Sequence, residues 1–126
     1  MLRSISYITL WVRNFEETVA LYRDVLGLPV EYADESFVQF ATAGTKLYLH
    51  GMKDAPPLRR RTVEIHFDVP NVDTAAEELR RRGVVFEQEP ANMPWGTRQA
   101  WFRDPEGYMV ELVGPLKPGE PAVPED

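Results

Sequence analysis

The side chains best suited to chemistry are two glutamates and two histidines in short alternating segments. Glu64 and His66 are two residues apart in Val-Glu-Ile-His-Phe-Asp, so a strand there places both side chains on one face. Glu111 lies in Val-Glu-Leu-Val, and His50 ends Leu-Tyr-Leu-His. Because carboxylates and imidazoles are ligands for zinc, manganese and iron, these four residues define one hypothesis, a metal site.

Two alternatives compete with a metal site. Each histidine is alone in its strand, and a step of two residues covers about 6.5 Å, which favours hydrogen-bonding wall residues over ligands. Alternatively, Glu64 and Glu111 face each other in a half-apolar cavity and share a proton, which raises one pKa into the range of a general base. If the protein is an enzyme, we expect these two glutamates to be its catalytic residues.

Flat aromatic side chains accompany these charged groups. The chain has three tryptophans, Trp11, Trp95 and Trp101, while Tyr7 and Tyr48 add rings with hydroxyl groups. Such a wall can stack a planar aromatic or conjugated ligand, and nearby carboxylates favour a cationic group on it. The residues around Trp101 do not alternate cleanly, so its facing stays open, with ordinary core packing the favoured interpretation.

The elements that position these residues form an internal repeat. Residues 5–14 and 62–71 are both alternating segments that end in Asn, and each precedes a helical pattern that ends at Gly27 or Gly83. Each half then closes on a similar apolar strand before a glycine. The repeat predicts an α+β fold of two βαβββ modules in one chain.

The apolar periodicity gives the element boundaries. The predicted strands are 4–12, 29–34, 36–42, 45–50, 61–69, 84–89, 97–103 and 108–113, and the predicted helices are 15–26 and 72–82. Asn14 followed by Glu17 predicts a capping-box start for the first helix. Segment 51–60 is a linker by composition, segment 90–96 a loop, and Asp104-Pro105-Glu106-Gly107 a turn.

Overlaying the halves pairs Tyr7 with Glu64 and Tyr48 with Glu111. These four equivalent positions, one per strand, would converge on a single cavity. Two carboxylates and two phenols are poor ligation for a catalytic divalent metal, so we expect no metal and no cofactor.

Alternation also assigns the sheet faces. Apolar residues such as Ile8, Leu10 and Val12 are expected to pack under the helices. The opposite face and the loop at its rim form the expected ligand-binding wall. Its residues are Tyr7, Thr9, Trp11, Tyr48, His50, Glu64, His66, Trp95, Trp101, Met109 and Glu111.

Two runs carry a family resemblance. Residues 21–28, Leu-Tyr-Arg-Asp-Val-Leu-Gly-Leu, and 103–112, Arg-Asp-Pro-Glu-Gly-Tyr-Met-Val-Glu-Leu, with the two modules, resemble the vicinal oxygen chelate superfamily of glyoxalases, bleomycin-resistance proteins and extradiol dioxygenases. The resemblance covers residues 4–114. It implies that each module curls into a half-open barrel with the site on its concave face. It also implies His, Gln or Glu at the four paired positions in metal-dependent members, where only Glu111 matches the usual final carboxylate.

A second run narrows the resemblance. Residues 94–98, Pro-Trp-Gly-Thr-Arg, are similar to the corresponding stretch of bleomycin-resistance proteins. Those proteins bind a drug without catalysis in the grooves of a dimer, using aromatic side chains. The resemblance therefore implies a homodimer and a ligand role for Trp95, which the residues alone balance evenly against plugging a barrel edge.

Composition excludes other classes of function. The chain has 126 residues and a formal net charge of −6, which argues against nucleic acid as a partner. It has no cysteine, which excludes disulfides, a thiolate nucleophile and a thiolate zinc site. No apolar stretch approaches the ~20 residues of a membrane span, and no export signal is evident, so we expect a cytoplasmic protein without a membrane partner. Residues 1–114 are predicted as one domain (module one about 4–51, module two about 61–114), and the Pro-rich 115–126 as a weakly ordered tail.

The sequence thus favours a metal-free small-molecule binder that sequesters an aromatic or amphipathic compound such as an antibiotic. The alternative is a metal- or carboxylate-dependent lyase, isomerase or dioxygenase.

Overall fold

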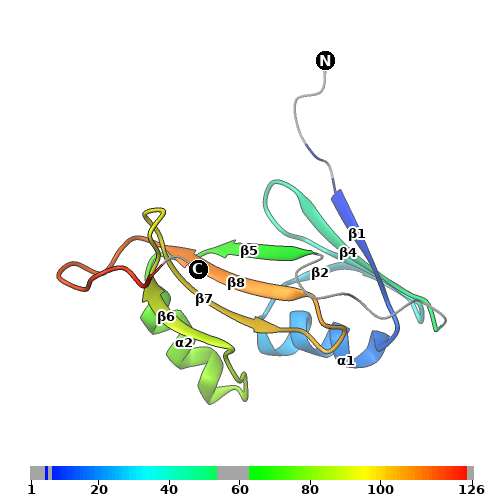
Figure 1. The fold of residues 1–126 in the computed structure, drawn as a ribbon. Coiled ribbons are helices and arrows are strands. Elements are labelled where there is room, and N and C mark those ends of the chain that lie inside the picture. Colours follow the sequence, from blue (N-terminus) through cyan, green and yellow to red (C-terminus); the bar gives the residue numbers. More distant parts are fainter. Residues whose placement is uncertain (1–4, 6, 54–62, 125–126) are drawn as a thin grey trace. The chain divides into compact units, whose positions relative to one another are not determined.

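The computed structural model describes residue 5 and residues 7–53 and 63–124, and contacts divide the chain into two compact units (Figure 1). The units are Met1–Pro57 and Leu58–Asp126. Parts of the predicted linker (54–60) and of the strand that follows it (61–62) lie outside the described residues. Within the described ranges, no helix is long and apolar enough to cross a membrane.

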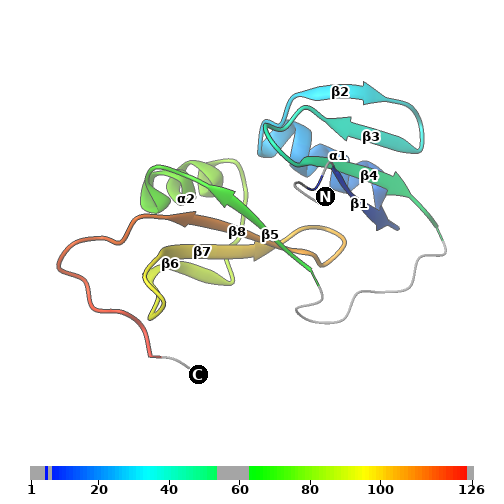
Figure 2. The ribbon, with the colours of Figure 1, turned by 90° about the horizontal axis from the view of Figure 1, so that it is seen from above.

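The first unit has the predicted βαβββ order. Its elements are β1 (Tyr7–Val12), α1 (Phe15–Ala20), the π-helical segment η1 (Leu21–Val25), β2 (Val30–Ala33), β3 (Phe37–Phe40) and β4 (Lys46–Gly51). The strands lie in the order β1-β4-β3-β2 (Figure 2). β1 runs parallel to β4, while β3 is antiparallel to both of its neighbours, so the sheet stays open at β1 and β2.

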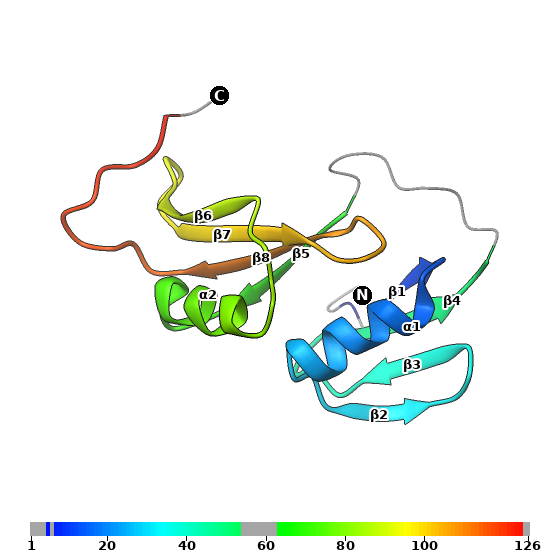
Figure 3. The same ribbon diagram turned by 90° about the horizontal axis from the view of Figure 1, so that it is seen from below.

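The second unit repeats this arrangement. Its elements are β5 (Glu64–Asp68), α2 (Val72–Arg81), β6 (Gln88–Asn92), β7 (Arg98–Arg103) and β8 (Met109–Gly114). The strand order is β5-β8-β7-β6, with β5 parallel to β8. α2 packs against β6, β7 and β8 on one face of the sheet (Figure 3). The prediction of an α+β fold of two βαβββ modules with half-open sheets is confirmed.

The strand registers show the same repeat. In the first unit Thr9 pairs with Tyr48, and in the second unit His66 pairs with Glu111. The overlay drawn from the sequence makes these two pairs equivalent, because it aligns β1 with β5 and β4 with β8. Corresponding side chains therefore occupy corresponding places on the two sheets.

Apolar residues on the helix-facing side of each sheet form the cores. Val12, Tyr22, Phe40 and Leu49 are fully buried in the first unit. In the second unit the buried residues include Val72, Ala76, Ala100, Phe102, Val110 and Leu112. Burying such side chains contributes roughly 1.5–3 kcal/mol each to folding.

The prediction that Ile8 packs under the helix is wrong, because its side chain is 46% exposed. The helical run α1–η1 has eleven residues (six and five), or about 16 Å, whereas the six residues of β1 extend about 20 Å. The helix is therefore too short to cover the whole strand, and Ile8 lies near the end that it leaves uncovered.

The first helix departs from its prediction in two ways. The Asn14 side chain makes no capping hydrogen bond, so the predicted capping box is wrong, whereas Asn71 does cap α2 by accepting from the Thr74 N–H (3.0 Å). The predicted helix 15–26 also changes from α to π after Ala20, and the Leu26 N–H donates to the Leu21 carbonyl (2.8 Å).

β6 is shifted from its prediction. The sequence placed a strand at 84–89 and a loop at 90–96, but pairing covers Gln88–Asn92. The Val84 N–H donates to the Leu79 carbonyl (3.0 Å), which ties the start of the predicted strand to the end of the helix. Pro90 is tolerated because β6 is an edge strand, and the register shifts between Gln88 and Ala91. The loop that carries Trp95 is therefore a tighter hairpin than expected.

The predicted turn after β7 is present. The Asp104 carboxylate accepts hydrogen bonds from the N–H groups of Glu106, Gly107 and Tyr108 (2.9, 2.8 and 2.9 Å). Gly107 has φ of 102°, a conformation that glycine adopts without steric cost. This turn sets the antiparallel register of β7 and β8.

The Pro-rich segment after β8 is hydrogen-bonded to the second unit. The Asn92 side chain donates to the carbonyls of Lys117 (2.9 Å) and Glu120 (2.8 Å) and accepts from the Lys117 N–H (2.9 Å). The Glu120 carboxylate pairs with the buried Arg98 guanidinium, and the Val123 N–H donates to the Asn92 carbonyl (2.9 Å). The expectation of weak order, based on composition, took no account of these anchors.

Candidate functional site

A cavity of about 300 Å³ lies in the second unit. β5, β7, β8 and the hairpin between β6 and β7 each contribute to its wall. The lining residues are Glu64, His66, Trp95, Gln99, Trp101, Met109 and Glu111. Six of these seven were expected in a ligand-binding wall, and the volume lies at the lower end of the range for small-molecule sites.

Strand register explains why these residues face the same way. His66, Glu111 and Trp101 are consecutive partners across β5, β8 and β7, so their side chains share one face of the sheet. Glu64 pairs with Met109 two residues earlier on the same strands, so these side chains lie on the same face. The register places Trp101 in the cavity wall, so the favoured expectation of ordinary core packing for this residue is wrong.

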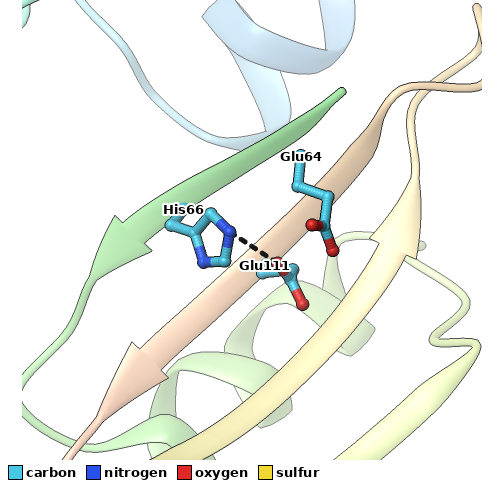
Figure 4. A group of neighbouring side chains, drawn as sticks. All are labelled: Glu64, His66 and Glu111. Atoms are coloured by element: carbon cyan, nitrogen blue, oxygen red, sulfur yellow. Dashed lines mark ion pairs between the residues drawn. The ribbon is translucent and has the colours of Figure 1, made fainter. Parts of the chain in front are cut away.

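Two carboxylates and one imidazole form the polar centre of the cavity (Figure 4). His66 Nε2 lies 2.8 Å from a Glu111 carboxylate oxygen. One ligating atom from each of Glu64, His66 and Glu111 lies within 4.8 Å of the other two. The Glu111 side chain is 5% exposed and that of His66 is 48% exposed, so the pair spans from the sheet interior to the opening.

A hydrogen bond fixes the aromatic wall. Trp95 Nε1 donates to Gln99 Oε1 (2.7 Å), which also accepts from the Thr97 hydroxyl (3.2 Å). Trp95 is 62% exposed, so without this hydrogen bond its ring could adopt several rotamers. Gln99 is the lining residue that the sequence analysis missed. It lies two residues before Trp101, so the two-residue period of the strand could have identified it.

The remaining predicted site residues lie in the first unit. Tyr7 stacks on Tyr48 with ring centroids 4.5 Å apart, and Trp11 stacks on His50 at 4.1 Å. The Trp11 ring is on the same strand face as Thr9 and Tyr7, as alternation predicts. These rings form an aromatic sheet face, of which Tyr7 is 55% and Trp11 48% exposed.

His50 belongs to the first unit, whereas Glu64, His66 and Glu111 belong to the second. Its Nδ1 lies 3.1 Å from the Gly51 carbonyl, within the first unit. Among the described residues, the group of potential metal-binding side chains comprises Glu64, His66 and Glu111 only. Three of the four residues of the predicted metal site thus come together within one unit.

The chemistry of this donor set leaves a metal as a competing occupant. One imidazole and two carboxylates are ligand types that zinc and manganese accept. In the first unit, however, the equivalents of Glu64 and Glu111 are the phenols Tyr7 and Tyr48, which stack on each other. Of the four equivalent positions, only the two in the second unit thus carry carboxylates, which are the stronger metal ligands.

Comparison with known proteins identifies the family. The chain belongs to the Glyoxalase/Bleomycin resistance protein/Dioxygenase superfamily, whose family model matches residues 4–112. A curated relative is the uncharacterized protein YraH of Bacillus subtilis (strain 168), 29% identical over 119 residues that cover 83% of this chain and 93% of YraH.

Solved structures show the same fold. A glyoxalase/bleomycin resistance protein/dioxygenase from Nocardioides is 27% identical with a TM-score of 0.80, covering 99% of this chain and 91% of that one. TnmS3, an antibiotic binding protein from Streptomyces sp. CB03234, is 24% identical with a TM-score of 0.72, covering 91% and 98%. A lactoylglutathione lyase from Agrobacterium tumefaciens is 20% identical with a TM-score of 0.73, covering 90% and 94%. The last two are similar in fold alone, and between them they represent a binder and an enzyme.

Proposed function

We propose that this protein binds a small aromatic or amphipathic molecule in the cavity of the second unit and sequesters it unchanged. The observation that carries the proposal is the Trp95–Gln99 hydrogen bond beside Trp101. It orients the Trp95 indole, so that two indole rings line the cavity before a ligand binds. The fold shared with the antibiotic binding protein TnmS3 supports this role, and an antibiotic is the leading specific ligand.

The proposal includes a metal-free state, a homodimer and a cytoplasmic setting. Phenols at two of the four equivalent positions support the first. The exposed edge strand β2 and the exposed aromatic face of the first unit support pairing of two copies, which covers such surfaces. Elemental analysis should find well under one equivalent of transition metal, and light scattering should give twice the chain mass. One equivalent of bound metal, or a monomer at micromolar concentration, would contradict these points.

Acridine, a neutral planar molecule of three fused rings, is a suitable probe for the binding test. It should quench tryptophan fluorescence saturably, and mass spectrometry should recover it unchanged after long incubation. Trp95→Ala and Trp101→Ala should each weaken binding several-fold, because an aromatic pair contributes roughly 0.5–1.5 kcal/mol beyond area burial. Tyr32→Ala is the matched control, since Tyr32 is an exposed aromatic residue of the first unit outside the predicted site. The sequence also predicts Trp11 in the ligand-binding wall, and this prediction requires that Trp11→Ala weaken binding as well.

A second function has one specific observation in its favour. Contact between His66 and the buried Glu111 (2.8 Å), with Glu64 nearby, is an arrangement that general acid–base catalysis can use. An enzyme would convert its ligand, whereas a binder returns it. Turnover that is lost in Glu111→Gln while ligand binding persists would replace the sequestration proposal with this one.

A further inference from the structure

We propose that the cavity of the second unit selects planar organic cations and that Glu64 is the residue that selects them. This inference rests on the proposed binding function and adds the chemical class of the ligand.

The first argument is the charge of the cavity wall. Among the described residues that line it none is Lys or Arg, while two are glutamates and one is a histidine. If His66 is protonated, it neutralises one carboxylate and leaves one negative charge. If His66 is neutral, both carboxylates remain charged. The wall is negative in either state, so a bound cation is stabilised and a bound anion is repelled.

The second argument separates the roles of the two glutamates. Glu111 is buried, and its carboxylate lies against His66 Nε2 (2.8 Å), so that charge already has a partner. Glu64 is exposed and makes no hydrogen bond or ion pair within the described residues. The Glu64 carboxylate therefore faces an incoming ligand without having to break an existing contact. It also lies within 4.8 Å of the other two groups, at the polar centre rather than on a distant rim.

The third argument concerns the shape of the cation. Trp95, Trp101 and Met109 line the same cavity as Glu64. An indole face attracts a positive charge and also stacks on a flat ring, so a planar aromatic cation uses both the carboxylate and the indoles. A bare metal ion would gain nothing from the two tryptophans. A cavity of about 300 Å³ admits a molecule of a few fused rings rather than a large peptide antibiotic as a whole.

Three acridines of nearly the same shape test the proposal at pH 7.5 in low salt. 9-Aminoacridine is a cation at this pH, acridine is neutral and acridine-9-carboxylate is an anion. We expect 9-aminoacridine to bind about five- to tenfold more tightly than acridine, the range between an exposed ion pair and a partly desolvated one. The carboxylate should bind more weakly than acridine. The cation preference should shrink as salt rises, because the Glu64 charge is exposed.

Glu64→Gln keeps the shape of the side chain and removes the charge. The ratio of the acridine and 9-aminoacridine dissociation constants should fall toward one in this variant. Asp68→Asn is the matched control, since Asp68 is an exposed carboxylate further along β5 that is not part of the cavity lining. The ratio should be nearly unchanged in the control, which loses the same formal charge.

The outcomes separate the inference from the proposed function. Failure of all three acridines to bind overturns the binding function itself. Equal affinities for the three overturn the cation selection and leave the binding function standing. An equal loss of preference in Glu64→Gln and Asp68→Asn means that net charge alone acts, which refutes the role of Glu64. Stoichiometric binding of zinc chloride that displaces 9-aminoacridine assigns the carboxylates to a metal and also refutes the inference.

Discussion

Replacing Arg98 by Met should lower the free energy of unfolding of the second unit by about 2–3 kcal/mol. Arg98 is the most highly bonded side chain near the base of the Trp95 hairpin, and it is 4% exposed. Its guanidinium donates two parallel hydrogen bonds to the Asp73 carboxylate (2.8 and 2.9 Å) and pairs with Glu120. It also donates to Asn92 Oδ1 (3.2 Å). These bonds join α2, β6, β7 and the C-terminal segment.

The magnitude follows from what each partner does after the substitution. Hydrogen bonds to charged groups contribute roughly 1.5–3 kcal/mol, but the Asp73 and Glu120 side chains are 44% and 37% exposed and regain water. The Asp73 contact is therefore discounted to about 1 kcal/mol, and the Glu120 contact adds further stability. The Asn92 oxygen is buried and loses one donor, which adds about 0.5–1 kcal/mol. The Met side chain retains the apolar contacts, so no large cavity term is added.

Urea unfolding followed by circular dichroism measures the change. Arg103→Met is the matched control, because Arg103 lies on the same strand and has one carboxylate partner, Glu87 (2.9 Å), at a more exposed position. That variant should lose about 1 kcal/mol or less. A loss in Arg98→Met no larger than in the control would refute the assignment of Arg98 as the anchor of the C-terminal segment.

Two further predictions concern stability. The Arg98 hydrogen bonds hold the pKa values of Asp73 and Glu120 below their usual range, so these pairs stabilise the protein above the unfolded pKa values and the contribution is lost as pH falls through the folded ones. Urea midpoints should therefore fall more between pH 7 and about pH 3 in the parent than in Asp73→Asn/Glu120→Gln, and equal falls would contradict this. Gly114→Ala should destabilise by about 1–3 kcal/mol, because an added Cβ would lie 2.7 Å from the Val69 carbonyl oxygen. Gly51→Ala meets only the Phe15 side chain at 3.2 Å and should cost less.

The fold could be predicted from the sequence because the two halves of the repeat can be compared with each other. The alternation of β1 and β5 and the closing strands of the two halves gave the same overlay, and the strand registers agree with it. Pairs such as Thr9–Tyr48 and His66–Glu111 could be placed in equivalent positions without any knowledge of distance. Period-two alternation is reliable where one face is apolar and the other polar, as in these strands.

β7 shows why the facing of Trp101 could not be predicted from alternation. Residues Arg98, Ala100 and Phe102 share the face that α2 covers, while Gln99 and Trp101 face the cavity. Each face thus mixes polar and apolar residues, so hydropathy along β7 does not alternate with the two-residue period of a strand. Arg98 is buried because Asp73 and Glu120 satisfy its charge, and both lie far from it in the chain. A contact of this kind is a tertiary effect that local pattern cannot reveal.

The two units have kept the same register and diverged in chemistry. At the positions equivalent to Glu64 and Glu111, the first unit has Tyr7 and Tyr48, whose rings stack at 4.5 Å and whose strands carry the Trp11–His50 stack. The carboxylates of the second unit lie instead with Trp95 and Trp101 around a cavity. If the repeat had retained one function in both halves, similar ligand types would be expected in both. The difference argues that recognition of charge belongs to the second unit, so Glu64→Gln should alter ligand choice, whereas Tyr7→Phe in the first unit should leave it unchanged. Equal effects of Glu64→Gln and Tyr7→Phe on the 9-aminoacridine to acridine ratio would refute this division.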